Sequence, residues 1–502
     1  MTNSARLYLS IAAAALLAYL GALGHGFALD DVPIIATNPV VHHWSGILTA
    51  FRAPYWPPAS GAAMYRPLVL ASFALDWQTG QPIWLHLVNV LWHAAASVAV
   101  ALLTKRWSGS HAAALLAGGV FAVHPVHVEA VANLVGRAEL MAATFAMVSV
   151  YVALQHDRLE WSLIACALGL LCKESAAVTP ALIGAGWLMG VGIRPTGRRA
   201  SAYVAGWACL AIAYGVVRWT LLHRYSDQVL VAPVFVGAGF PDARMTAIAS
   251  FADFTRLLLF PVTLRADYSP AERTLVATPA DPRFLLGVLC LLLWGGLLFL
   301  SWRRGRRLIT FGLCWMAIAL LPVANLLFAT GVLVAERTLY LPSAGLAIAL
   351  GDALSVLRGR RLVAVVAVIL IAGGVRTATR VPVWRNSLTV LKSVQEDSPR
   401  SYVGPMWTAS TALARHQAAD ALNDFRIAAG RTMGAPKLLT LGADVAFALH
   451  QPRLADSLLA ALERICDRCP FYYEFEERAA LARGDSAVAD SFRVRRPASP
   501  IR

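Results

Sequence analysis

Residues 284–301 read FLLGVLCLLLWGGLLFLS, and residues 303–307, almost directly after them, read RRGRR. A helix that crosses a bilayer needs about 20 mainly apolar residues, and about 17 can suffice. The apolar run therefore predicts a membrane-spanning helix. The arginines predict its cytoplasmic end, because cationic residues are retained on that side of the membrane. This pattern decides the fold, since it recurs along most of the chain.

Apolar runs of this kind follow one another up to residue 375. They are 7–23, 84–103, 111–123, 140–155, 161–172, 178–192, 200–222, 284–301, 308–328, 339–357 and 362–375. We therefore predict an all-α fold, a polytopic membrane helical bundle of about eleven spans. The shortest runs are expected to be tilted spans or half-helices packed inside the bundle.

The composition supports a membrane protein and argues against a soluble one. Hydrophobic residues make up 58% of the chain and charged residues 15%, whereas soluble domains are about 45–50% apolar and about 25% charged. The formal net charge of +15 would suggest a nucleic-acid partner in a soluble protein. Here the cations lie in short loops between apolar runs, so we predict the lipid bilayer as partner and no nucleic acid.

The basic residues occupy alternate connections, which predicts the orientation of the chain. The clusters are Arg6, Lys105 with Arg106, Arg158, Arg194 with Arg198 and Arg199, the arginines of 303–307, and Arg358 with Arg360 and Arg361. They predict a cytoplasmic N-terminus and an extracytoplasmic tail in a plasma membrane, with a bacterial inner membrane as the expected location. The loops 24–83 and 223–283 then lie outside, and the apolar stretch 245–261 is expected to be re-entrant or interfacial.

The tail, 376–502, differs in composition from the rest of the chain. Alanine-rich runs at 402–414, 418–430, 437–450 and 454–466 are separated by short Gly- and Pro-containing turns. Their helical spacing predicts two to three helical hairpins, resembling degenerate tetratricopeptide (TPR) repeats. Cys466 and Cys469 lie here, and a disulfide or a pair of idle thiols is favoured over a redox or zinc site.

Ionisable residues gather at the predicted outer ends of the spans, where a functional role is the default hypothesis. Asp30 and Asp31 follow the first run, and His86, Asn89 and His93 share one helix face at the start of the second. The remaining candidates are Arg66, His124, Glu129, Arg137, Glu139, Lys173, Glu174, Glu336 and Arg337. We expect Glu129, Asn133 and Arg137 to form a polar stripe on one interfacial helix.

Each of these groups also has a structural interpretation. The paired aspartates can order a turn, since Asx side chains bond nearby backbone amides. The histidine face can be a polar seam between packed spans. Glu129 with Arg137, and Glu336 with Arg337, can be neutralising pairs. Convergence of five separate segments on one side of the membrane favours function.

Seven segments, in order, resemble one family. They are Asp30-Asp31 with TNP at 37–39, YRPL at 65–68, HLVNVLWH at 86–93, HPVHVEAV at 124–131, GRAEL at 136–140, CKES at 172–175 and AERTLYLPS at 335–343. Together they resemble the transmembrane and tetratricopeptide-repeat-containing (TMTC) proteins over nearly all of residues 1–375. The tail has room for fewer repeats than the family's long arrays.

The resemblance implies a C-type (GT-C) glycosyltransferase with a core at 1–375. Such an enzyme moves a sugar, usually mannose, from a polyprenyl-phosphate carrier to a protein Ser or Thr hydroxyl with inversion. Asp31 is then our preferred general base, with Asp30 as the alternative. Arg337 is the first choice for the donor phosphate, followed by Lys173, Arg137 and Arg66. The remaining candidates, His86, His124, Glu129, Glu139, Glu174 and Glu336, would line the donor and acceptor site.

No Cys/His constellation points to a metal, so we expect no cofactor, and a carboxylate-bound divalent ion stays an alternative. Two other functions stay open. One is a non-catalytic membrane scaffold whose tail binds a protein partner. The other is a transporter or flippase, which predicts broken helices, internal repeats and polar sites at mid-membrane.

Overall fold

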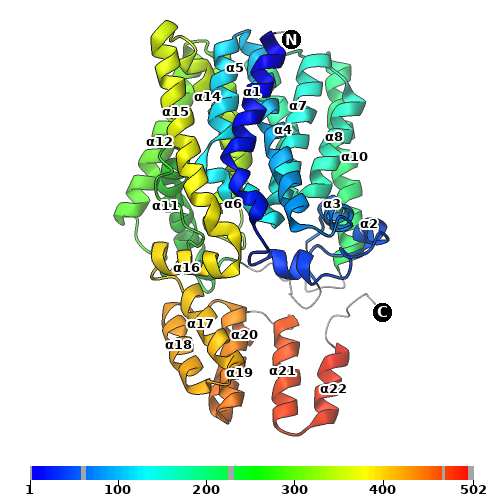
Figure 1. Ribbon diagram of the computed structural model, residues 1–502, viewed down its shortest axis with the longest axis vertical. Coiled ribbons are helices and arrows are strands. Elements are labelled where there is room, and N and C mark those ends of the chain that lie inside the picture. Colours follow the sequence, from blue (N-terminus) through cyan, green and yellow to red (C-terminus); the bar gives the residue numbers. More distant parts are fainter. Residues whose placement is uncertain (1–2, 58–63, 224–230, 466–469, 496–502) are drawn as a thin grey trace.

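The computed structural model is an all-α protein in which a bundle of long helices is followed, along the longest axis, by a group of shorter helices from the tail (Figure 1). It describes residues 3–57, 64–223, 231–465 and 470–495. Within these ranges every regular element is a helix. The predicted fold class, an all-α polytopic bundle, is therefore confirmed.

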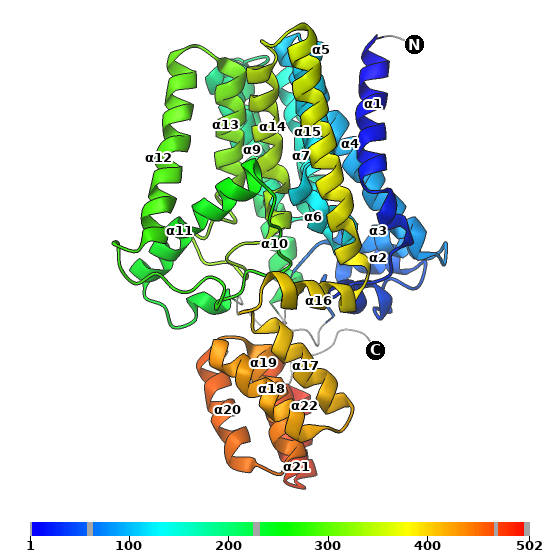
Figure 2. The same ribbon diagram turned by 60° about the vertical axis from the view of Figure 1, so that its left-hand side comes forward.

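Each of the eleven apolar runs predicted from the sequence overlaps one helix of the bundle. These helices are α1 (Asn3–Ala18), α4 (Pro82–Ser108), α5 (His111–Ala122), α7 (Arg137–His156), α8 (Leu159–Cys172), α9 (Thr179–Met189), α10 (Gly197–Leu222), α12 (Pro282–Arg303), α13 (Arg307–Leu320), α14 (Tyr340–Leu354) and α15 (Gly359–Arg380). They run side by side in both views (Figures 1 and 2).

Among the described residues, five stretches are long and apolar enough to cross a membrane on their own: α4, α10, α12, Leu134–His156 and Gly359–Arg385. A sixth span results if α5 and the segment Pro125–Ala132, which meet at a 44° bend, count as one. Outward-facing side chains on these helices, such as Leu292 and Ile371, are large, apolar and exposed, as expected of a lipid-facing surface. The described chain is that of a membrane protein, and the number of about eleven spans stays a prediction.

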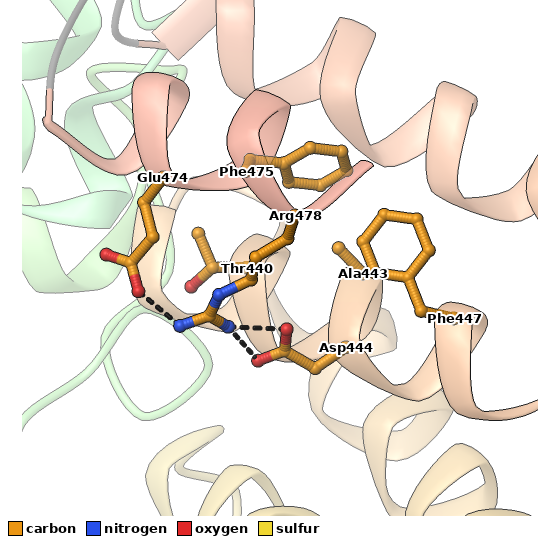
Figure 3. A pocket seen from close by; sticks show the side chains of 7 residues that line it. All are labelled: Thr440, Ala443, Asp444, Phe447, Glu474, Phe475 and Arg478. Carbon is orange, nitrogen blue, oxygen red and sulfur yellow. Dashed lines mark hydrogen bonds and ion pairs between the residues drawn. The ribbon is translucent and has the colours of Figure 1, made fainter. Parts of the chain in front are cut away.

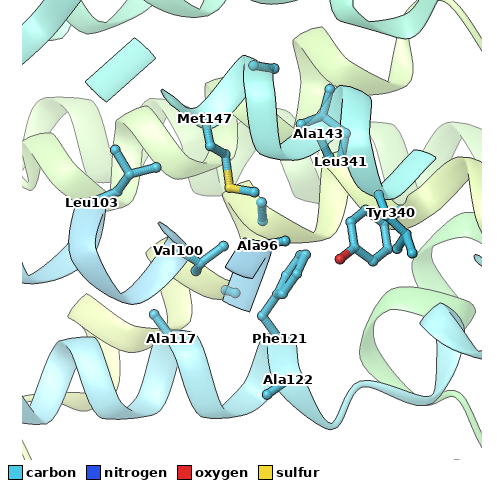
Figure 4. Close-up of a cluster of buried hydrophobic side chains, with 14 of the residues drawn as sticks. Ala96, Val100, Leu103, Ala117, Phe121, Ala122, Ala143, Met147, Tyr340 and Leu341 are labelled. Carbon is cyan, nitrogen blue, oxygen red and sulfur yellow. The ribbon is translucent and has the colours of Figure 1, made fainter. Parts of the chain in front are cut away.

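The centre of the bundle is closely packed around small residues. In Figure 4 Phe121 lies near Ala96 and Val100 of α4, and its ring meets that of Tyr340 edge-on, with the ring centroids 5.1 Å apart. Helices α13 and α14 approach most closely at two glycines, because a Cβ on Gly312 would lie 2.5 Å from the carbonyl oxygen of Gly345. Small residues at such contacts allow helix backbones to approach closely in membrane proteins.

One end of the bundle, which the sequence predicts to be extracytoplasmic and which we call the outer end, is built from loop helices. The first loop forms α2 (Gly46–Thr49) and α3 (Pro67–Trp77), and the second long loop forms α11 (Phe240–Leu259). The stretch predicted to be re-entrant or interfacial falls largely in α11, which packs along α12 (Figure 2). Phe251 and Phe254 of α11 are buried. Helix α16 (Ser387–Asp397) lies across this end, between bundle and tail (Figure 1).

The described part of the tail after α16 forms six helices in three packed pairs, at the upper limit of the predicted two to three hairpins. They are α17 (Val403–Ala414), α18 (Ala418–Arg431), α19 (Pro436–Ala448), α20 (Pro452–Ile465), α21 (Pro470–Ala482) and α22 (Ser486–Arg495). Arg478 of α21 binds Asp444 of α19 at 2.5 and 2.6 Å (Figure 3). Cys466 and Cys469 lie outside the described residues, and the likeness to TPR repeats stays a prediction.

The junction between tail and bundle is polar and specific. The hydroxyls of Ser398 and Ser401 donate to the backbone oxygen (2.8 Å) and the carboxylate (2.5 Å) of Asp267. The amide of Arg400 donates to Glu272 at 2.7 Å. The second long loop therefore holds the start of the tail against the outer end of the bundle.

The close approach of α13 and α14 gives a test of the packing. We expect Gly312→Leu to lower the melting temperature in detergent markedly, because overpacking a tight contact typically costs about 1–3 kcal/mol. Gly295→Leu in α12 is the matched control, since a Cβ there meets nothing within 4 Å. Equal melting temperatures for the two variants would contradict the described packing.

Candidate functional site

A short turn places Arg337 at the outer end of the bundle, immediately before α14. Its guanidinium donates to one oxygen of Glu129 at 2.5 Å, and its backbone amide donates to the other at 2.9 Å. Glu129 belongs to α6 (Val128–Ala132). The Glu129 side chain is 5% exposed, whereas that of Arg337 is 30% exposed. Both oxygens of the Glu129 carboxylate are thus engaged with Arg337, while the Arg337 guanidinium is still partly exposed at the surface.

Two further carboxylates nearby hold the other cations. Lys173, at the end of α8, donates to Glu139 of α7. Glu174 binds Arg66 at 3.0 Å and Arg218 at 2.9 Å. We call this set, with Glu129 and Arg337, the ion-pair cluster. Its members come from segments far apart in the sequence, as the convergence on one side predicted.

Burial and neighbouring charges shift the pKa of several members of the cluster. Burial opposes the charge on Glu174, but Arg66 and neighbouring donors lower its pKa to about 2. Burial lowers the pKa of Lys173, and the charge of Glu139 opposes this. Glu129 raises the pKa of Arg337. Cations held beside carboxylates at a surface can bind a phosphate when it displaces or bridges these contacts.

Asp31, the preferred base in the sequence analysis, is held inside the protein by backbone amides. Its side chain is fully buried and accepts hydrogen bonds from the amides of Ala28 (3.0 Å), Leu134 (3.4 Å) and Val135 (2.9 Å). Burial raises the pKa of Asp31 to about 7, although these three amides lower it. The residue ties the first loop to the start of α7. It has no open face toward a substrate.

Asp30 is placed differently. Its side chain is partly exposed and forms no hydrogen bond or ion pair with any residue that the structure describes. It is nevertheless close to the ion-pair cluster, since its charge raises the pKa of Arg337. The preceding residue, Leu29, has a positive φ of 47°, and its amide donates to the hydroxyl of Ser387 at 2.9 Å. The start of α16 therefore fixes the backbone that carries Asp30.

Arg137 is wholly engaged inside the protein, contrary to its predicted role in phosphate binding. Its guanidinium is fully buried and donates to Asp76 (2.5 Å), Asn89 (2.8 Å), the backbone oxygen of Leu85 (2.8 Å) and Ser72 (3.2 Å). The expected Glu129–Arg137 pair is absent. The expected stripe of Glu129, Asn133 and Arg137 is also wrong, because α6 ends at Ala132 and α7 begins only at Arg137.

Glu336 does not pair with its neighbour Arg337 as the structural interpretation supposed. Its carboxyl accepts hydrogen bonds from the amide of Arg265 (2.6 Å) and the hydroxyl of Tyr268 (2.9 Å). Burial raises the pKa of Glu336 to about 8. Glu336 thus connects the second long loop to the turn that carries Arg337, and it holds that turn in place.

The histidines support the packing of the outer end. His86 contacts the backbone oxygen of Gly26 at 3.2 Å, and His124 contacts that of Leu258 at 3.0 Å. His93 contacts the hydroxyl of Tyr340 at 2.8 Å. All three histidines are buried. These contacts fit the polar seam between packed helices better than a role in substrate binding.

Two residues of the site were missed in the sequence. Asp76, the partner of Arg137, lies in the apolar helix α3, and Arg218, the partner of Glu174, lies near the end of the apolar helix α10. Both are single charges inside apolar stretches. Burying an ionisable residue in an apolar stretch costs free energy unless it has a charged partner. The position of each charge in such a stretch could therefore have marked both residues as candidates.

The candidate residues offer no evident metal site. Within 3–57, 64–223, 231–465 and 470–495, no group of three or more His, Cys, Asp or Glu side chains is arranged to hold an ion. Every cation of the ion-pair cluster instead has a carboxylate partner. The expectation that the chemistry needs no metal stays a prediction.

The known proteins that are similar to this chain share one name, protein O-mannosyl-transferase. No protein-family model matches the chain. It is 28% identical to a Caenorhabditis elegans protein O-mannosyl-transferase over 65% of this chain and 48% of that protein. It is 26% identical to Drosophila melanogaster Tmtc1 over 81% of this chain and 60% of that protein. Human protein O-mannosyl-transferase TMTC3 is 28% identical over 66% of this chain and 40% of its own length.

The fold and the site define a polytopic, all-α membrane protein with an ion-pair cluster at one end of its bundle. The relatives that the chain matches include TMTC protein O-mannosyl-transferases, which supports the resemblance to the TMTC family that the sequence motifs indicated. The chain spans about half the length of the curated relatives that it matches.

The buried carboxyl of Glu336 gives a test by pH. Its folded pKa of about 8 lies above the ordinary value of 4.5. Between these two values the folded protein keeps a proton that the unfolded chain has released, so stability must fall as the pH rises. We expect Glu336→Gln to flatten the decline of the melting temperature between pH 5 and pH 8 (roughly the window set by these pKa values). Glu396→Gln, at an exposed carboxylate of α16, is the control, and equal pH slopes for both variants would refute the assignment.

Proposed function

We propose that this chain is a membrane glycosyltransferase. It transfers a sugar, which we take to be mannose from the names of its relatives, from a polyprenyl-phosphate carrier to a protein Ser or Thr hydroxyl. The observation that carries the proposal is Asp30, a carboxylate without a partner among the described residues, beside the partly exposed cation Arg337. A free base next to a held cation is what this transfer requires.

The reaction follows from these two charges. The acceptor hydroxyl oxygen forms a bond to C1 of the sugar, and its proton passes to the Asp30 carboxylate. The bond between C1 and the phosphate oxygen breaks, and the carrier phosphate leaves with the electron pair. Attack opposite to the leaving group inverts C1. General-base help of this kind contributes roughly 10²–10⁴-fold in rate.

The departing phosphate is assigned to Arg337, with Lys173 and Arg66 behind it. Arg337 is the most exposed of the three, since its side chain is 30% exposed against 15% for Lys173 and 13% for Arg66. Its planar guanidinium matches two phosphate oxygens at once. Glu129 holds Arg337 before the donor binds and keeps the cation in place, which reduces the reorganisation needed in the transition state.

Asp30 takes the role that the sequence alone favoured for Asp31. Three backbone amides donate hydrogen bonds to Asp31 and use both of its carboxylate oxygens, and the side chain has no exposed surface. A base must reach the proton that it removes, and Asp30 has the free face for this. We keep Asp31 as the residue that positions the Asp30 loop.

The donor's position is proposed from the apolar surface beside the cluster. Arg218 lies on α10, whose neighbouring side chains Val217 and Trp219 are exposed. A polyprenyl chain can lie along this face in the bilayer while its phosphate reaches the cluster. We further propose that this end is extracytoplasmic, from the alternating basic loops, that residues 1–375 form the catalytic core, and that the tail binds the acceptor protein.

The central test separates the two aspartates. We expect Asp30→Asn to lower turnover about 10²-fold or more, because the proton acceptor is lost, and to leave the melting temperature unchanged. Asp31→Asn should instead lower the melting temperature, since an amide nitrogen would face the amides that now donate to the carboxylate. The measurements are transfer from radiolabelled polyprenyl-phosphate mannose and thermal unfolding of the purified protein in detergent.

The two variants control each other because they differ by one position in the same loop. A stable Asp30→Asn variant with native turnover would refute the proposed base. A stable Asp31→Asn variant that has lost turnover would return the role to Asp31.

The phosphate assignment has its own test. We expect Arg337→Ala to reduce transfer strongly and Arg337→Lys to restore it only in part, because lysine keeps the charge but loses the bidentate geometry. Arg304→Ala, at an exposed arginine directly after α12, is the control. Native turnover in a folded Arg337→Ala variant would move the role to Lys173 or Arg66.

A further inference from the structure

A second site lies at the opposite end of the bundle from the ion-pair cluster. The ends of α4, α7 and α9 and the start of α13 surround a cavity of about 430 Å³. Its lining residues are Arg106, Trp107, Gln155, Gly190, Val191, Gly192, Ile193, Arg307 and Leu308. We call it the basic cavity. Nothing in the proposed transfer reaction uses it.

The two arginines of the basic cavity lack ionic partners. Neither Arg106 nor Arg307 forms an ion pair or a side-chain hydrogen bond with another residue in the part of the chain that the structure describes. The lining contains no Asp or Glu. By contrast, nearby arginines are paired, since Arg199 binds Asp157 at 3.1 Å and Arg306 approaches Asp352 at 3.6 Å. The cavity therefore holds two uncompensated positive charges.

Other groups in the cavity also donate hydrogen bonds. Gln155 adds a side-chain amide to the lining of the cavity. The guanidinium of Arg307 lies close to Gly190, where an added Cβ would be 3.3 Å from its nitrogen. A set of donors without an acidic acceptor selects an anion and disfavours a metal ion or a cationic ligand.

We propose that the basic cavity binds the phosphate of an anionic phospholipid headgroup. Guanidinium groups match phosphate oxygens in charge and geometry, and basic pockets between membrane helices are typical sites for such headgroups. Leu188 and Ile193, at the same end of α9, are 78% and 46% exposed and offer an apolar surface for the acyl chains. This surface favours a lipid over free phosphate, which has no apolar part.

The test measures lipid-dependent stability of the purified full chain in detergent. Dioleoylphosphatidylglycerol should raise the melting temperature in a saturable manner, and dioleoylphosphatidylcholine should not. The double variant Arg106→Ala with Arg307→Ala should need about tenfold more phosphatidylglycerol for the same shift, because two charge-assisted contacts are lost. Arg304→Ala with Arg361→Ala is the control, since it removes the same charge from the same end outside the cavity.

Any of the following outcomes would refute binding of a lipid phosphate in the basic cavity. An equal loss in the control pair would mean general attraction to a basic surface. Saturation by millimolar inorganic phosphate, with no further effect of lipid, would assign the cavity to free phosphate. A lower melting temperature with an unchanged lipid response would mean that the arginines only stabilise helix ends. If the double variant fails to fold, Arg106→Gln and Arg307→Gln are tested singly, and a native lipid response in both rejects the site.

Discussion

The buried guanidinium of Arg137 organises the outer end of this protein. A charge removed from water is tolerated only when partners satisfy it, and breaking a buried pair typically costs about 3–5 kcal/mol. Arg137 meets this requirement with Asp76 of α3 and Asn89 of α4, and with further oxygens from the same two helices. The side chain of Arg137 thereby connects α7 to α3 and α4. The segment that carries Arg137 is held in a fixed position relative to these two helices.

The candidate site is built outward from that segment. The amides of Leu134 and Val135 bind Asp31, and Glu139, two residues after Arg137, binds Lys173. One short stretch thus positions the first loop on one side and the ion-pair cluster on the other. Once these pairings are made, Asp30 remains as a partly exposed carboxylate without a side-chain partner among the described residues, which is the observation behind its proposed role as the base.

The tail contributes to the same region. The hydroxyl of Ser387 accepts the amide of Leu29, and the backbone oxygen of Arg385 accepts the amide of Gly26. The positive φ of Leu29 is an uncommon conformation for this residue type, and it persists because α16 holds it. The entry to the tail therefore supports the loop of the proposed base, which gives bundle and tail a shared role in the geometry of the site.

The sequence by itself determined the fold class, the positions of the helices and the end of the bundle at which ionisable groups gather. These properties follow from local hydrophobicity and charge, because each apolar run must leave water as a helix whatever its neighbours are. The pairing of charges was decided only by the tertiary structure. The sequence suggested Glu129 with Arg137 and Glu336 with Arg337, whereas the folded chain pairs Glu129 with Arg337.

The choice between the aspartates was decided in the same way. Asp30 and Asp31 are adjacent and chemically identical, so no local pattern distinguishes them. The amides of Leu134 and Val135, more than a hundred residues further along the chain, pack against Asp31 in the folded protein. The Asp31 carboxylate is therefore buried, whereas that of Asp30 stays partly exposed. Ionic and hydrogen-bond partners are set by which segments meet in space, and sequence spacing does not encode that meeting.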